Sequence, residues 1–106
     1  MLFRSDSQKA IILGNKLKNW LATNLDKSKE YAATKLLKLK NEDWLGENES
    51  PVTQKAFINL IEFDGINAFA EGSFEIYFTD HNLFGGHTII VDVNENLEFE
   101  NAIIAG

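Results

Sequence analysis

The chain has 106 residues, a formal net charge of −6 and no cysteine. This length predicts a single domain spanning residues 1–106, and the lack of cysteine excludes disulfides, thiolate chemistry and cysteine-based zinc sites. The excess of acidic residues argues against nucleic-acid binding, which needs basic side chains opposite the phosphates. The sequence contains no signal-peptide pattern and no apolar run near the ~20 residues of a membrane-spanning helix, so we expect a cytoplasmic protein without membrane contacts.

Two helices are predicted in the first part of the chain. Between residues 5 and 25, apolar residues recur every three or four positions, as on one face of an amphipathic helix: Ala10, Leu13, Leu17, Trp20 and Leu21. A second helix is predicted over residues 26–40, with Asp26 or Ser28 as its N-cap and lysines in its last turns. The short link between the two predicts an antiparallel helical hairpin.

A polar connector and a short third helix follow. Residues 46–51 read GENESP, which is typical of a loop. Thr53 is the predicted N-cap of a helix that carries Ala56, Phe57 and Leu60. The helical part of the domain is therefore expected to cover about residues 5–60.

Beyond residue 60 the apolar pattern changes to an alternation typical of strands. Four strands are predicted, over residues 61–69, 73–79, 87–93 and 98–104. Short turns between them favour an antiparallel β-meander over about residues 61–105. We therefore predict the α+β class, with an N-terminal helical hairpin and a short third helix packed on a four-stranded antiparallel sheet.

Charge is divided between the two parts of the chain. Nine of the ten basic residues precede Leu45, so the strand-forming part is strongly acidic. In the second strand, Glu75 and Tyr77 alternate with apolar residues and are predicted to face outward. The turn after that strand contains Phe84, which is expected either to contact a partner or to plug the turn from below. The candidate binding surface consists of Glu75, Tyr77, Asp80, Phe84 and Asp92.

The only two histidines, His81 and His87, lie in the same turn. Together with Asp92 they form a weak candidate metal site, because imidazole and carboxylate groups suit divalent metals. The alternative is structural: His87 opens a strand, and its ring bonds a carbonyl of the turn. Gly85 and Gly86 precede a strand, so they do not form a phosphate-binding loop. No catalytic group of residues is recognisable, no cofactor is predicted, and an enzyme is the less expected class.

Three segments resemble motifs of one known family. They are EYAATKLLKLKNEDWL at residues 30–45, GSFEIYF at residues 72–78 and LFGGHTI at residues 83–89. In this order they are similar to the uncharacterised bacterial family called Domain of Unknown Function 2262, over about Ile12 to Gly106. The chain departs from that family at Gly85, where a tryptophan is usual, and at residues 80–82, where Asp-His-Asn replaces Asp-Gly-Asp.

The resemblance brings no assigned activity, but it implies one structural feature. Longer members of the family carry a preceding β-rich region, so the present sheet is expected to have an exposed edge. Such an edge favours pairing with another chain, which makes a homodimer through a sheet edge one expected partner.

The leading functional hypothesis is an acidic protein-binding module, of which an immunity-type protein with a basic partner is one version. The alternative is a metal-dependent or small-ligand-binding domain centred on the turn from His81 to His87.

Overall fold

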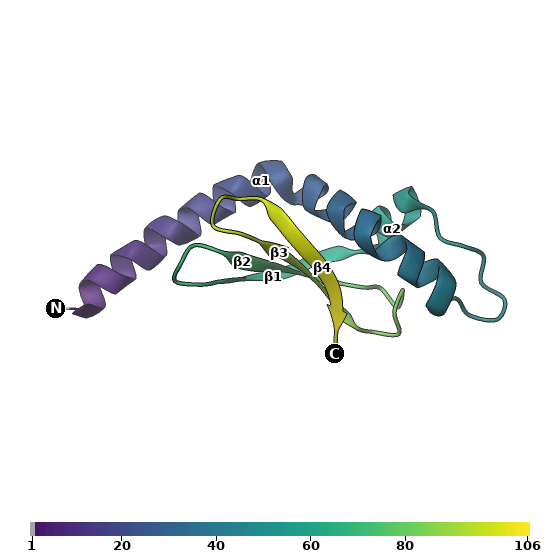
Figure 1. Cartoon of the computed structure of the whole chain (residues 1–106). Coiled ribbons are helices and arrows are strands. Elements are labelled where there is room, and N and C mark those ends of the chain that lie inside the picture. Colours follow the sequence, from purple (N-terminus) through teal and green to yellow (C-terminus); the bar gives the residue numbers. More distant parts are fainter. Residues whose placement is uncertain (1) are drawn as a thin grey trace.

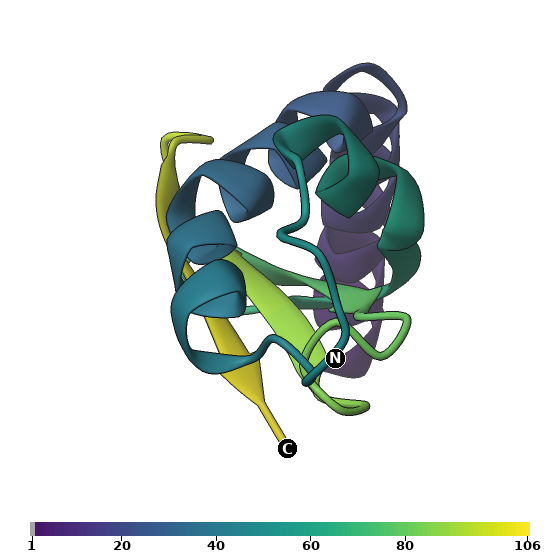
Figure 2. The ribbon, with the colours of Figure 1, turned by 90° about the vertical axis from the view of Figure 1, so that its right-hand side faces the viewer.

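The computed structural model describes the backbone of residues 2–106 and the side chains of residues 15–106. Within these limits the chain forms two helices followed by four strands (Figure 1). Figures 1 and 2 show both helices on the same side of the sheet. The α+β class and the four-stranded antiparallel sheet are therefore confirmed.

The predicted helical hairpin is wrong, because residues 2–43 form one helix, α1 (Leu2–Asp43). Ser28, one of the two predicted N-caps, instead bonds back to the preceding turn, and so does the nearby Asn24. Ser28 Oγ donates to the carbonyl of Asn24 at 2.8 Å, and Asn24 Nδ2 donates to the carbonyl of Trp20 at 2.8 Å. Such back-bonds let short polar side chains sit inside a continuous helix, and they often bend it. Figure 1 shows α1 arching over the sheet.

The short helix was predicted correctly as α2 (Gln54–Leu60). Its N-cap is Thr53, whose side chain accepts a hydrogen bond from the backbone N–H of Ala56 at 3.1 Å. This bond satisfies one of the N–H groups that a helix leaves unpaired at its start.

Polar contacts hold the connector between the helices against the end of α1. The buried Lys40 ammonium donates to Glu49 Oε1 at 3.0 Å and to the carbonyl of Trp44 at 2.8 Å. Asn41 bonds both backbone groups of Val52 through its side-chain amide. Because the buried Lys40 charge has an anionic partner and a carbonyl acceptor, its burial is tolerated.

The sheet is a simple meander. Strands β1 (Glu62–Ala68), β2 (Phe74–Thr79), β3 (Thr88–Val93) and β4 (Phe99–Ala105) lie side by side in the order β1-β2-β3-β4, each antiparallel to its neighbour. Irregularities interrupt the register at Phe63/Gly65 in β1 and at Asp92/Val93 between β3 and β4.

The core lies between the helices and one face of the sheet, which we call the inner face. Alternate residues of β2 and β3 point into it and are buried: Phe74, Ile76, Phe78, Ile89, Val91 and Val93. Helix α1 covers them with Leu17, Ala32, Ala33 and Leu36, and α2 with Phe57. Trp20 packs edge-on against Phe74, with 5.3 Å between the ring centroids. The intervening residues of each strand form the opposite, outer face.

Candidate functional site

The outer face of the sheet carries a row of polar side chains that crosses all four strands. The strand register places Asn67 opposite Glu75, Glu75 opposite Asp92, and Asp92 opposite Asn101. We call these four residues the polar row. Two carboxylates thus lie directly across an antiparallel pair, an arrangement that destabilises a sheet.

Tyr77 is tied to the polar row through Glu75. Its hydroxyl donates to Glu75 Oε1 at 2.6 Å, and Asn67 Nδ2 approaches the same oxygen at 3.4 Å. The hydrogen bond to Glu75 raises the pKa of the Tyr77 hydroxyl, and partial burial and the Glu75 charge act in the same direction. The phenol is therefore a neutral donor that holds Glu75 in place at neutral pH.

Asp92 differs from Glu75 because no hydrogen bond or ion pair to its carboxylate is present among the side chains of residues 15–106. Partial burial raises its pKa, and the nearby charges of Glu75 and Glu100 raise it further. The Asp92 carboxylate is thus partly desolvated, surrounded by like charge and available to a cation from outside.

Apolar side chains lie beside the polar row on the same face. The register sets Tyr77 opposite Ile90 and Ile90 opposite Ile103, and Ile103 is 42% exposed. We call these three residues the apolar row. An aromatic and two aliphatic groups beside carboxylates are the composition expected where a protein partner docks.

The turn at residues 80–87, by contrast, is held together by a buried carboxylate. Asp80 is buried, and its carboxylate accepts four backbone hydrogen bonds of 2.9 to 3.1 Å, from the N–H groups of Asn82, Phe84, Gly86 and His87. With all these donors converging on it, the carboxylate fixes the path of the turn. Asp80 is therefore not part of an exposed surface.

Phe84 is fully buried beneath this turn and does not contribute to an exposed surface either. Its ring packs edge-on against Trp44 and Phe57, at centroid distances of 5.7 and 6.1 Å. The position is the plug that was one of the two sequence-based alternatives. Trp44 also covers the turn from outside, because its ring lies 3.7 Å from the place where a Cβ on Gly85 would stand.

The three weak metal candidates do not come together. The His87 ring bonds the carbonyl of Phe84 through Nδ1 and packs against Trp44, while His81 is exposed and has a φ of 47°. Asp92 lies five residues along the chain from His87, roughly 17 Å away in an extended strand. Among the residues whose side chains are described, no group of three or more ligand-type side chains could hold a metal ion.

Sequence reasoning therefore found three of the residues gathered on the outer face, Glu75, Tyr77 and Asp92, and missed four others. The missed residues are Asn67, Asn101, Ile90 and Ile103. The alternation within β3 and β4 could have placed Ile90 and Ile103 on the outer face, but only the register between strands shows that they adjoin Tyr77. No short sequence motif contains that register.

Within the described part of the chain, neither helix has the length and apolar character needed to cross a bilayer. No curated protein and no solved structure matches the chain. A family described as an uncharacterised protein conserved in bacteria, Domain of Unknown Function 2262, matches residues 4–104. This match covers nearly the whole domain, including the polar row, the apolar row and the turn around Asp80, and the chain belongs to that bacterial family.

Proposed function

We propose that the protein is an interaction module that binds a basic protein partner through the outer face of its sheet. The observation that carries the proposal is the pair of carboxylates on Glu75 and Asp92, directly opposite one another without a cation from residues 15–106 between them. Like charges in this position cost stability. A partner that supplied a lysine or arginine at this point would remove the repulsion.

The apolar row gives the same surface a second component. Charged pairs mainly set the rate and specificity of association, whereas buried aromatic and aliphatic groups supply most of the affinity. Tyr77, Ile90 and Ile103 adjoin the carboxylates closely enough to be covered by the same partner. Inhibition of a basic toxin by this acidic surface, as in an immunity protein, is a biological setting that suits this chemistry.

No observation of comparable weight favours a metal or small ligand at the turn. The buried Asp80 carboxylate is occupied by backbone N–H groups, and the Nδ1 atom of His87 is occupied by the Phe84 carbonyl. These contacts account for the turn without a ligand.

The proposal is tested by capture of the partner from a lysate of the bacterium that encodes the protein. Tagged wild-type protein is compared with the double variant Glu75→Lys/Asp92→Lys, at low and moderate salt. A stoichiometric basic protein is expected with the wild type, less of it at higher salt, and none with the variant.

The matched control is Glu42→Lys/Glu47→Lys, which changes the net charge by the same amount at exposed acids near the end of α1. The control is expected to retain the partner. Equal binding by the outer-face variant and the control would refute the proposed surface, and the absence of any protein partner would refute the function.

A further inference from the structure

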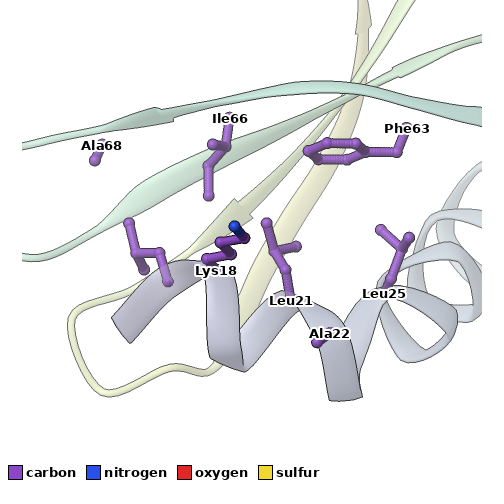
Figure 3. A pocket seen from close by; sticks show the side chains of 8 residues that line it. Lys18, Leu21, Ala22, Leu25, Phe63, Ile66 and Ala68 are labelled. Atoms are coloured by element: carbon purple, nitrogen blue, oxygen red, sulfur yellow. The ribbon is translucent and has the colours of Figure 1, made fainter. Parts of the chain in front are cut away.

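A second surface, on the other side of the sheet, is unaccounted for by the proposed function. An apolar groove of about 440 Å³ lies between the first half of α1 and the edge strand β1 (Figure 3). Its lining residues are Leu17, Lys18, Leu21, Ala22, Leu25, Phe63, Ile66 and Ala68. All but Lys18 are apolar, and Phe63 is 43% exposed. An open groove of this composition indicates a surface that is covered in the functional state.

Helix α1 is long enough for its first turns to cover this groove in a second copy of the chain. A helix of 42 residues is about 63 Å long at about 1.5 Å per residue, and the molecule measures 60 Å in its longest dimension. Strands of six or seven residues span only about 23 Å. The first turns of α1 therefore run past the end of the sheet, as Figure 1 shows.

The sequence of these first turns suits an apolar groove. Residues 2–14 include Leu2, Phe3, Ala10, Ile11, Ile12 and Leu13. Ala10 and Leu13 continue, at steps of three and four, the stripe to which the groove residues Leu17 and Leu21 belong. Most helical stability in proteins comes from packing of an apolar face, so a stripe that continues past the sheet calls for a packing partner.

The groove itself is suited to an apolar occupant. Figure 3 shows that it runs from Ala68 to Phe63, with Leu25 at the Phe63 end. Lys18 is the one charged residue among the lining side chains that the structure describes.

We propose that the chain forms a symmetric dimer in which the first turns of α1 in each copy occupy the groove of the other. The two helices run antiparallel and cross near residues 14–16. Residues 5–13 of one copy then lie beside residues 17–25 of the other. Gly14, without a side chain, lets the helices approach closely at the crossing.

The groove and the first turns of the partner's helix are both needed for a stable interface. The eight groove residues are fewer than the ~20–30 residues per partner of a specific interface. The first turns of the partner's helix extend the contact toward that size. The two surfaces are also self-complementary, as an interface with two-fold symmetry requires.

The test is the mass of the full chain in solution, measured by sedimentation equilibrium across a wide concentration range. We expect twice the single-chain mass of 12.0 kDa at the higher concentrations. The variant Ala22→Arg places a bulky charged side chain on the apolar wall of the groove and is expected to remain a monomer. Ala22 is exposed on a helix, so the variant is expected to keep its fold, as checked by circular dichroism.

Thr34→Arg is the matched control, because Thr34 is exposed on the second half of the same helix, away from the groove. It is expected to dimerise like the wild type. A 12.0 kDa mass for the wild type at the highest concentration would overturn the proposal. So would a dimer that survives Ala22→Arg, as expected if the copies met through the backbone edge of β1 instead.

The crossing point is tested by disulfide formation, which is easily read because the natural chain has no cysteine. Asn15→Cys lies at the proposed axis and should form a covalent dimer under mild oxidation, whereas Thr34→Cys should not. Equal cross-linking of the two variants would contradict the antiparallel arrangement.

Discussion

The turn at residues 80–87 precedes β3, and the polar row crosses β3 near its other end. Each of these regions contains an aspartate that is at least partly shielded from water. In the turn, the buried carboxylate of Asp80 accepts four backbone hydrogen bonds. On the outer face, the half-buried Asp92 lies opposite Glu75, and its pKa is raised. A carboxylate with all its hydrogen bonds made within the chain stabilises that chain. One that lacks them destabilises the free protein and is available to a partner.

The largest loss of stability is expected when the buried ring of Phe84 is removed from beneath the turn. Phe84→Ala removes a fully buried ring that packs against Trp44 and Phe57, and should lower the free energy of unfolding by about 3–5 kcal/mol. Urea denaturation measures the loss. Phe69→Ala, at a ring 40% exposed, should cost less than about 1 kcal/mol. Equal losses would mean that Phe84 does not support the turn.

A somewhat smaller loss is expected for Asp80→Asn, which keeps the shape of the side chain and removes one acceptor oxygen and the charge. At least one backbone N–H then loses its partner, so the free energy of unfolding should fall by about 2–3 kcal/mol. The exposed Asp64 offers the comparison, because Asp64→Asn should change stability by less than about 0.5 kcal/mol. If Asp80→Asn changed stability as little as Asp64→Asn, the backbone hydrogen bonds to the Asp80 carboxylate would not stabilise the fold.

On the outer face, removing a carboxylate should raise the free energy of unfolding instead of lowering it. Asp92→Asn removes a like charge facing Glu75, and should raise the free energy of unfolding at neutral pH by about 0.5 kcal/mol. Because the folded-state pKa of Asp92 is raised above its ordinary value of 3.8, the folded state binds the proton more tightly than the unfolded state. The stability cost of Asp92 is therefore present above the folded pKa and disappears as the pH falls below 3.8.

Thermal unfolding of the wild type and Asp92→Asn across this pH range measures the difference. The two proteins should converge in acid. If Asp92→Asn were still more stable than the wild type at low pH, the charge of Asp92 would not be the cause of the difference in stability.

The smallest effect concerns Tyr77. Glu75→Gln removes the charged acceptor of its hydroxyl and should lower the Tyr77 pKa toward the ordinary value of 10.0. The absorbance of tyrosinate during an alkaline titration reports this change, and a Tyr31→Phe background leaves Tyr77 as the only tyrosine. An unchanged titration would show that Glu75 does not hold the hydroxyl.

The sequence predicted the strands and their faces because the alternation of side chains is local. Phe74, Ile76 and Phe78 point inward, as their spacing requires, and Thr53 caps α2 as its position before the helix indicates. The helical hairpin was wrong for a local reason too. Ser28 can cap a new helix or bond back within an existing one, and its residue type does not distinguish the two.

The site was only partly predictable because its geometry depends on contacts between distant residues. Glu75 and Tyr77 were assigned to the outer face by parity alone. Asp80 and Phe84 were expected in a surface turn, yet the turn folds inward around them because Trp44, from the end of α1, covers it. The polar row needs the register of all four strands, which no single segment specifies.

The meander also determines which contacts form early in folding. Each strand pairs with its sequence neighbour across a short turn, so closing each pair costs little chain entropy. The stacking of Tyr31 on Phe99, with 5.1 Å between their centroids, joins residues roughly 70 positions apart. The hairpins are therefore expected to form before α1 docks across them, so mutations in the turns should slow refolding, whereas mutations at the Tyr31–Phe99 contact should mainly speed unfolding.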